Sequence, residues 1–304
     1  MCGIVGYVGD RDCADVLVDA LSKLEYRGYD SAGIAVVEKG VIKVEKCKGR
    51  LANLVDKMAV DGKPQGHCGI GHTRWATHGE PSDINSHPHG NKRVSIVHNG
   101  IIENYKQIKD FLIEEGYSFV SETDTETVAK LLDYYYVDDP VDTIIKVLSE
   151  IKGSYALGIM FRDYPDTVFA VRKECPLIVG VGENENFLAS DVPAIIKYTR
   201  DYYLLEANEI AVVKKDSVQI YDMHKEPVHK EINTADWDVD AAEKGGYEHF
   251  MLKEIHEQPA AVRDTVSPRI INGMPDLSQD GVDMQKLKDY RQIFIVACGT
   301  AMPA

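Results

Sequence analysis

The amino-acid sequence predicts an α+β fold in which two β-sheets lie between layers of helices. Three observations lead to this prediction. Strand-like apolar runs occur in the first hundred residues, amphipathic helical segments alternate with or follow them, and six further short apolar runs crowd the stretch that starts at Ser154. A chain of 304 residues with 44% hydrophobic residues is long enough to bury a sizeable core.

The N-terminal segment alternates strand and helix patterns. The run CGIVGYVG has the composition of a strand, and residues 12–25 carry an apolar face with helical spacing. A hairpin is expected from Ser31–Val37 and Val41–Lys46, which are joined by a Lys-Gly turn.

Two further core strands are predicted at Gly69–Thr73 and Val94–Val97. A long polar stretch separates them, and loops of that length in compact domains usually serve a function. Helices are expected at Asn104–Glu115 and Thr125–Tyr136, the second followed by Pro140.

From Ser154 onward the pattern is typical of an antiparallel sheet with tight turns, formed by YALGIMF, TVFAVR, LIVGVG, NFLAS, EIAVV and SVQIY. After about Ile232 the sequence becomes polar like a connector. The segment FMLKEIHEQPAAVRDTV is expected to form a helix interrupted near Pro259, and RQIFIVACGTAMPA has the pattern of a strand that begins a second α/β domain.

Charge and targeting signals restrict the class of protein. A formal charge of −15 without a long basic run argues against binding to nucleic acid or to an anionic membrane surface. No signal-peptide pattern and no apolar stretch of membrane-spanning length occurs, so a cytoplasmic protein is expected.

The cysteines and histidines do not form a recognisable metal motif. Six cysteines occur without a CxxC pair, which predicts reduced thiols and fits zinc poorly. His87 and His89, with His72 and His78 upstream, lack supporting ligand spacing, so neither a metal nor another cofactor is predicted. A redox sensor at Cys68 or Cys175 lacks a resolving cysteine at suitable spacing. The cysteines are Cys2, Cys13, Cys47, Cys68, Cys175 and Cys298.

Cys2 stands directly behind Met1 and ahead of a predicted buried strand. If Met1 is removed, Cys2 carries a nucleophilic thiol and a free α-amine, whose reference pKa of about 7.7 to 8.0 suits a base near neutral pH. The alternative is a small apolar residue that begins a buried strand.

The sequence VHNGIIEN places Asn99 and Gly100 after a predicted strand. A side-chain amide and a backbone N–H at this position are suited to an oxyanion hole. The alternative is an Asn-Gly hairpin turn, although the following IIENYKQI is more typical of entry into a helix.

Two charged residues suggest how an amino acid would be held. Arg74 in GHTRWATHGE can bind a carboxylate bidentately, with Thr77 and His78 beside it, and Asp124 can bind an ammonium group. Considered alone, an arginine such as Arg74 more often forms a surface ion pair, and an aspartate such as Asp124 more often caps a helix. Together with a nucleophile, they describe a site for a free amino acid.

The motifs CGIVGYVG, EYRGYDSAGIA, GHTRWATHG, HNGIIEN and SETDTE occur in this order and resemble the glutaminase domains of glucosamine-6-phosphate synthases, a family of class II glutamine amidotransferases. The resemblance covers most of residues 2–240 and implies the four-layer αββα sandwich of N-terminal-nucleophile hydrolases. Residues 241–290 then resemble the connector to a sugar-isomerase half, and residues 291–304 the truncated start of that half. Ala301 stands where the family's phosphate loop usually carries serine.

The resemblance also implies a role for each site residue. Cys2 is the nucleophile and Asn99 with Gly100 the oxyanion hole, whereas Arg74 and Asp124 bind the carboxylate and ammonium of L-glutamine. By the same resemblance, Thr77 and His78 complete the glutamine pocket, and Arg27 and Gly28 help to orient Cys2. Trp75 would gate the ammonia channel, and His87 would make a contact toward the sugar phosphate.

The implied activity is hydrolysis of glutamine to glutamate and ammonia through a thioester on Cys2. Fructose 6-phosphate would bind only through the absent isomerase domain, and a full-length protein is expected to be a homo-oligomer. Two alternatives stay open. Purine-pathway amidotransferases and asparagine synthetases typically carry RGQ or RGPD in place of RGYDSAG, and a chain that retains Met1 would be a non-catalytic glutamine-binding module.

Overall fold

The computed structural model describes residues 2–235, 247 and 249–292 of the chain. The chain divides into two compact units, Met1–Glu243 and Lys244–Ala304, and each is considered by itself. Among the described residues, no helix combines the length and apolar character needed to cross a bilayer.

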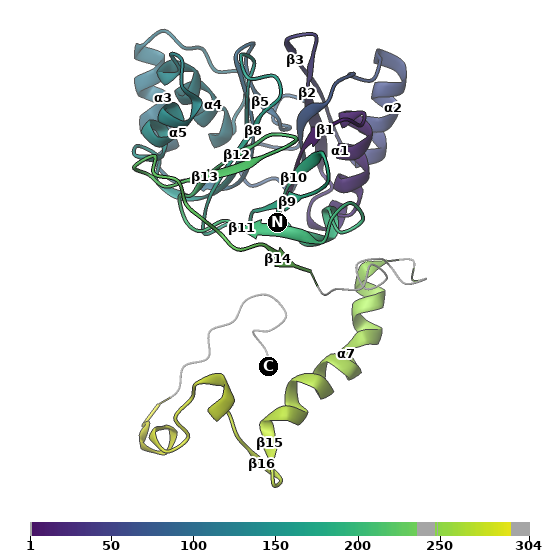
Figure 1. Ribbon diagram of the computed structural model, residues 1–304, viewed down its shortest axis with the longest axis vertical. Coiled ribbons are helices and arrows are strands. Elements are labelled where there is room, and N and C mark those ends of the chain that lie inside the picture. Colours follow the sequence, from purple (N-terminus) through teal and green to yellow (C-terminus); the bar gives the residue numbers. More distant parts are fainter. Residues whose placement is uncertain (1, 236–246, 248, 293–304) are drawn as a thin grey trace. The chain divides into compact units, whose positions relative to one another are not determined.

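The first unit contains an eight-stranded sheet in which every strand is antiparallel to its neighbours. Strand β1 lies near its middle, between β10 and β4 (Figure 1). In spatial order the strands are β14 (Asn233–Thr234), β11 (Asp201–Leu204), β9 (Ile178–Val181), β10 (Glu185–Ala189), β1 (Gly3–Gly9), β4 (Cys68–Arg74), β2 (Ser31–Glu38) and β3 (Val41–Lys48).

A second sheet of six strands is also antiparallel throughout. Its longest pairing joins β6 to β7 over nine residue pairs, and β7 lies with β8 at the centre of this sheet. In spatial order the strands are β13 (Val218–Tyr221), β12 (Ile210–Val213), β8 (Val168–Lys173), β7 (Gly153–Phe161), β6 (Val94–Ile102) and β5 (His89–Gly90).

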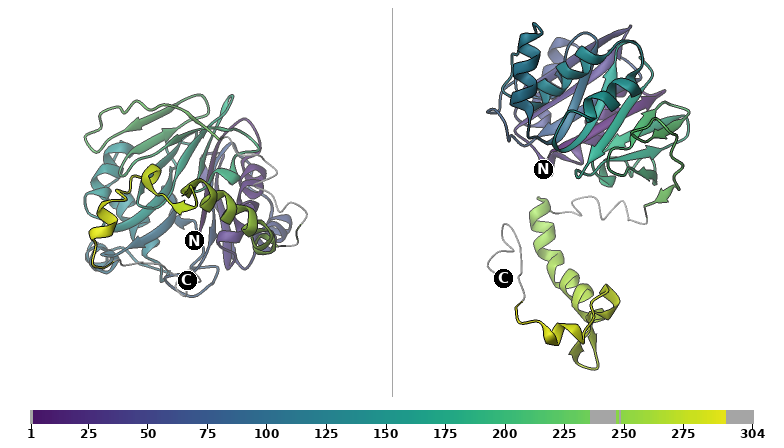
Figure 2. Two further views of the ribbon diagram at one scale, coloured as in Figure 1. Left: turned by 90° about the horizontal axis from the view of Figure 1, so that it is seen from below. Right: turned by 90° about the vertical axis from the view of Figure 1, so that its left-hand side faces the viewer.

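Helices cover the outer faces of both sheets and give four layers. Helices α1 (Cys13–Ser22) and α2 (Leu51–Asp61) pack on the eight-stranded sheet. Helices α3 (Tyr105–Glu114), α4 (Asp124–Tyr135) and α5 (Pro140–Leu148) lie on the side of the six-stranded sheet, and the right-hand view of Figure 2 faces them. This is the predicted arrangement of two sheets between helix layers.

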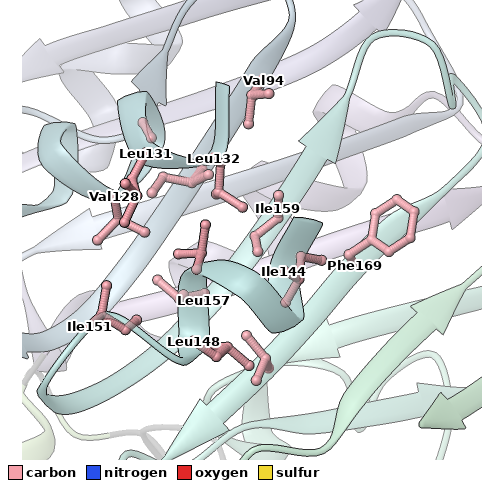
Figure 3. Close-up of a cluster of buried hydrophobic side chains, with 14 of the residues drawn as sticks. Val94, Val128, Leu131, Leu132, Ile144, Leu148, Ile151, Leu157, Ile159 and Phe169 are labelled. Atoms are coloured by element: carbon pink, nitrogen blue, oxygen red, sulfur yellow. The ribbon is translucent and has the colours of Figure 1, made fainter. Parts of the chain in front are cut away.

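Three hydrophobic clusters fill the spaces between the four layers. The strand period of two directs Leu157 and Ile159 of β7 toward the helices, whereas Ala156 and Met160 enter the cluster between the sheets. Figure 3 shows the first cluster, in which side chains of α4, α5 and the six-stranded sheet meet. Each fully buried aliphatic side chain contributes about 1.5–3 kcal/mol, so these clusters hold the layers together.

Several element boundaries differ from the predictions. Pro140 begins α5 instead of marking only the end of the preceding helix, because a proline loses nothing in the first helical turn and Asp139 caps the helix. Helix α2 was not predicted from the sequence. Strand β6 runs through Asn99 and Gly100 to Ile102, so these two residues do not form a hairpin turn, and α3 begins only at Tyr105.

The second unit begins with α7 (Phe250–Val266), which contains Pro259 as part of one helix, so the predicted interruption is wrong. A proline removes only one backbone hydrogen bond from a helix. The helix therefore continues on both sides of Pro259. A small hairpin of β15 (Ile270–Ile271) and β16 (Met274–Pro275) follows. The strand predicted from RQIFIVACGTAMPA lies almost entirely outside the described residues, as does the start of the predicted connector. Within the part of this unit that the structure describes, there are also 3-10 helices at Ser267–Arg269, Ser278–Asp280 and Lys286–Asp289.

Candidate active site

A cavity of about 310 Å³ brings together residues that lie far apart in the sequence. This volume is within the range of pockets that bind small molecules. All the predicted site residues except Gly28 line it. The lining comprises Cys2, Arg27, Arg74, Trp75, Thr77, His78, His87, His98, Asn99, Gly100, Ile101, Thr123, Asp124, Thr125, Ser154, Cys175 and Pro176.

The thiol of Cys2 lies at the start of β1, next to the end of β4. Its Sγ accepts a hydrogen bond from the Trp75 backbone N–H at 3.2 Å and lies 3.5 Å from the Trp75 carbonyl oxygen. Burial raises the pKa of the Cys2 thiol above its ordinary value, while the Trp75 N–H acts in the opposite direction. Burial is the larger effect, so the thiol needs a base to become a nucleophile.

Gly28 lies outside the cavity lining but supports the backbone that contacts Cys2. A Cβ on Gly28 would lie 2.7 Å from the carbonyl carbon of Arg74 and 2.9 Å from the Trp75 nitrogen. Arg27 lies beside it, and its guanidinium donates to the Asp191 carboxylate at 2.8 Å and to the Ser190 carbonyl at 3.2 Å.

Asp30 also helps to shape the site, although the sequence alone predicted no role for it. Its carboxylate accepts a hydrogen bond from the Ala76 backbone N–H, and its own N–H donates to the Arg74 carbonyl at 3.1 Å. These contacts hold the start of the loop that follows β4. The only signal was its place in the motif EYRGYDSAGIA, beside Arg27 and Gly28.

Arg74 is the last residue of β4 and is buried. Its Nη2 donates to the carbonyl oxygens of His78 and of Gly79, the latter at 3.0 Å. Its Nη1 is buried without a hydrogen-bond partner among the described residues. A buried, unpaired guanidinium N–H at a cavity wall is suited to an anionic ligand, because leaving it unsatisfied is costly.

Asp124 is the first residue of α4 and its carboxylate accepts a hydrogen bond from the Ile102 N–H at 2.8 Å. The helix is capped by the preceding residue, Thr123, whose hydroxyl accepts from the Glu126 N–H. The capping alternative for Asp124 is therefore wrong. Its buried carboxylate is instead part of the cavity wall.

The loop after β4 supplies three further predicted residues. Trp75 is 49% exposed and meets the Tyr29 ring edge to face, with ring centres 5.6 Å apart. Thr77 and His78 are adjacent, with the hydroxyl 3.4 Å from the imidazole Nδ1. The His78 ring also contacts Tyr105 edge to face. Trp75 and His78 therefore line the cavity while each packs against a tyrosine outside the lining.

Asn99 and Gly100 lie on β6, opposite Cys2. The Asn99 Nδ2 donates to the Cys2 carbonyl oxygen at 3.0 Å, and its Oδ1 lies 3.0 Å from His72 Nε2. Gly100 has a φ of 125°, and a Cβ there would lie 2.1 Å from the Ser154 carbonyl oxygen. Both the backbone conformation and the close contact require glycine at this position.

His87 is buried in the cavity wall, within a group of histidines. Its ring lies against His72 at 4.2 Å and against His89 at 4.9 Å between centres. Burial lowers the pKa of His87, of His89 and of His98 below the ordinary value. In the part of the chain that the structure describes, no three His, Cys, Asp or Glu side chains converge as a metal site would require.

Comparisons with known proteins show which family the chain resembles. Residues 72–197 match the family model described as a glutamine amidotransferase domain. Over its full length the chain is 56% identical to the isomerizing glutamine–fructose-6-phosphate aminotransferase of Caldanaerobacter subterraneus subsp. tengcongensis and 54% identical to that of Clostridium tetani. It covers 50% of each, so the chain spans about half the length of these curated relatives.

Solved structures show the same fold. The glutamine phosphoribosylpyrophosphate amidotransferase of B. subtilis superposes with a TM-score of 0.64 at 24% identity, over 73% of this chain and 49% of that one. A glutamine aminotransferase class-II domain protein from Silicibacter pomeroyi superposes with a TM-score of 0.52 at 13% identity, over 73% and 99% of the two chains.

The fold, the cavity and the sequence matches place the chain in the class II glutamine amidotransferases. Within that class it is the glutaminase domain that corresponds to one half of the isomerizing glutamine–fructose-6-phosphate aminotransferases, the glucosamine-6-phosphate synthases.

Proposed function

We propose that this domain hydrolyses L-glutamine to glutamate and ammonia through a glutamyl thioester on Cys2. The observation that carries the proposal is the cavity itself. It combines the Cys2 thiol, the unpartnered Nη1 of Arg74, the Asp124 carboxylate and the Asn99–Gly100 pair within a space of about 310 Å³.

The charged residues orient the substrate. Arg74 binds the α-carboxylate of glutamine, which satisfies its buried Nη1, and Asp124 binds the α-ammonium group. Thr77 and His78 complete the pocket from the loop after β4. With both charges held, the side-chain amide of glutamine extends toward Cys2.

The reaction begins when the Cys2 α-amine takes the proton of the thiol and the thiolate attacks the amide carbon of glutamine, so that the carbonyl electrons move to oxygen. Asn99 Nδ2 and the Gly100 N–H stabilise this oxyanion. The C–N bond then breaks, and ammonia leaves with a proton delivered by the Cys2 α-amine. Water then attacks the thioester carbon and the C–S bond breaks, which releases glutamate and regenerates the Cys2 thiol.

The α-amine exists only when Met1 has been removed. Because burial raises the pKa of the thiol, an adjacent base with a pKa near neutral is what makes Cys2 reactive. Gly28 packs tightly on the Arg74–Trp75 backbone that contacts Cys2, and Arg27 beside it is proposed to help orient Cys2. The proposed role of Trp75, which is partly exposed, is to gate the route by which ammonia leaves.

Similarity to the relatives supports a proposal for the larger context. Residues 2–240 form the glutaminase domain, residues 241–290 a connector, and residues 291–304 the start of a sugar-isomerase domain. In a longer cytoplasmic, homo-oligomeric protein, ammonia would pass to fructose 6-phosphate to make glucosamine 6-phosphate, with His87 oriented toward the sugar-phosphate side.

The test is glutamate and ammonia release from glutamine by the purified chain, measured together with its intact mass. We expect release when Met1 is absent, loss of release in Cys2→Ala with an unchanged fold, and release retained in Cys47→Ala, a control at a cysteine outside the cavity. Unchanged release in Cys2→Ala refutes the mechanism. Glutamine binding without release in a chain that retains Met1 identifies a non-catalytic binding module.

A further inference from the structure

His72 lies on β4 behind the cavity and is buried, with a relative exposure of 1%. Burial lowers the pKa of its imidazole to about 3, and the nearby Arg74 and His98 act in the same direction. The ring is therefore neutral at ordinary pH, and one of its two nitrogens carries a proton.

The neighbours of His72 determine which nitrogen carries this proton. The Cys2 carbonyl oxygen can only accept, so the Asn99 atom 3.0 Å from it is the amide nitrogen, and the other terminal atom is the oxygen. That oxygen lies 3.0 Å from His72 Nε2, and the His98 carbonyl oxygen lies 3.1 Å from the same nitrogen. Two acceptors at one nitrogen require an N–H there.

The other ring nitrogen is consistent with this tautomer. His72 Nδ1 is buried without a hydrogen-bond partner among the described residues, and the ring face packs against His87. An N–H at Nδ1 would leave a buried donor unsatisfied and two acceptors without a donor at Nε2. The tautomer with the proton on Nε2 therefore satisfies the largest number of hydrogen-bonding groups around His72.

We infer that His72 is a positioning residue for the glutaminase reaction: its Nε2–H holds the side-chain oxygen of Asn99, so that the Asn99 amide nitrogen faces Cys2 and the forming oxyanion. The inference rests on the proposed function, because the oxyanion arises only if Cys2 attacks an amide.

The physical reason is that an asparagine amide has two orientations of nearly equal shape. Rotation of the Asn99 amide by half a turn would bring an N–H toward the His72 N–H and an oxygen toward the Cys2 carbonyl. Both new contacts are repulsive. A side-chain oxygen turned toward Cys2 would also repel the oxyanion that the nitrogen is meant to stabilise. His72 thus removes the unproductive orientation.

A matched pair of amide variants tests this role. In His72→Gln the side-chain nitrogen reaches the place of the imidazole Nε2, whereas in His72→Asn the same amide ends too far from Asn99. Removal of a whole oxyanion-hole donor lowers kcat about 10²–10³-fold. We therefore expect kcat to fall about 10- to 100-fold in His72→Asn and by less than about threefold in His72→Gln, with little change in KM.

A double-mutant cycle separates positioning from general damage. In an Asn99→Ala background, His72→Asn should cause no further loss of kcat, because the amide that it orients is gone. Equal kcat losses in the two single His72 variants, or an undiminished loss in the double variant, would overturn the inference. Thermal unfolding of each variant reports whether it folds.

One measurement needs no variant. Two-bond ¹H–¹⁵N spectra of ¹⁵N-histidine-labelled wild-type chain report the tautomer of His72, assigned through its backbone. A neutral ring with the proton on Nε2 between pH 5 and 8 is expected, and an Nδ1–H ring or an imidazolium contradicts the inference. Absence of glutamate release by wild-type chain would instead refute the proposed function, and the spectra would still decide the geometry.

Discussion

Gly28 packs against the backbone that donates a hydrogen bond to Cys2, and Gly28→Ala is expected to slow the reaction of this thiol. The new Cβ would lie 2.7 Å from the Arg74 carbonyl carbon, 2.8 Å from its oxygen and 2.9 Å from the Trp75 nitrogen. Real Cβ contacts are not shorter than 3.0 Å, so the Arg74–Trp75 peptide must move by a few tenths of an ångström.

That movement acts on a single hydrogen bond. The Trp75 N–H lies 3.2 Å from Cys2 Sγ and lowers the pKa of this thiol against the effect of burial. Hydrogen bonds to ionised groups contribute about 1.5–3 kcal/mol, and each 1.36 kcal/mol corresponds to about one pKa unit. Loss of about half of that energy is therefore expected to raise the pKa of Cys2 further and to leave about tenfold less thiolate at pH 7.

The assay is the rate at which iodoacetamide alkylates Cys2, followed by intact mass between pH 6 and 10. Gly28→Ala should shift the rate profile toward higher pH and lower the rate at pH 7 about tenfold. Gly116→Ala is the control for general destabilisation by a glycine-to-alanine change, because Gly116 follows α3 outside the cavity and its strain comes from a φ of 90° in open space. An unshifted profile in Gly28→Ala, or an equal shift in Gly116→Ala, would refute the reasoning.

Three further predictions concern binding, folding and acid stability. Arg74→Ala should mainly raise the KM for glutamine in steady-state kinetics, since the residue is proposed to bind the substrate carboxylate; an unchanged KM would remove Arg74 from that role. Gly100→Ala should destabilise the domain by more than about 1 kcal/mol in chemical denaturation, because its φ is 125° and the added Cβ meets the Ser154 carbonyl; wild-type stability would contradict this expectation. The pKa of His72 is about 3 in the folded chain and 6.5 in the unfolded chain. Between pH 6.5 and pH 3 the unfolded chain therefore binds more protons, and the free energy of unfolding should decrease as the pH falls through this range. His72→Gln should reduce this slope by about 1.4 kcal/mol per pH unit; denaturation curves with identical slopes would show that His72 does not contribute.

Local sequence patterns predicted most of the strands and helices. They did not predict how the later strands of the first unit are divided between the two sheets. Runs such as YALGIMF and LIVGVG indicate strands because their composition and length are local properties. Whether a run joins one sheet or the other depends on long-range pairing. The structure places β7, β8, β12 and β13 in the six-stranded sheet but β9 and β10 in the eight-stranded sheet, where β10 pairs with β1 and β9 pairs with β10.

In the candidate site, too, some residues could be identified from the sequence and others only from their contacts in the fold. Motif residues such as Cys2, Arg74 and Asn99 could be named from the sequence because their chemistry is unusual at those places. Asp30 and His72 were not assigned roles, because a single aspartate or histidine is uninformative until its partners are known. Their contacts with Ala76 and Asn99 exist only after β2, β4 and β6 have come together.

The sequence by itself determined the strand and helix patterns, the family and the identity of the reactive groups, since these depend on residue type and spacing along the chain. Only the tertiary structure decided which of those groups face one another. Antiparallel pairing of β1 with β4, and packing of the two sheets, bring Cys2 next to Trp75 and opposite Asn99, 97 residues away in sequence. Hydrogen bonds of about 3 Å between such distant residues require a completed fold, so the geometry of the site is a property of the whole sandwich.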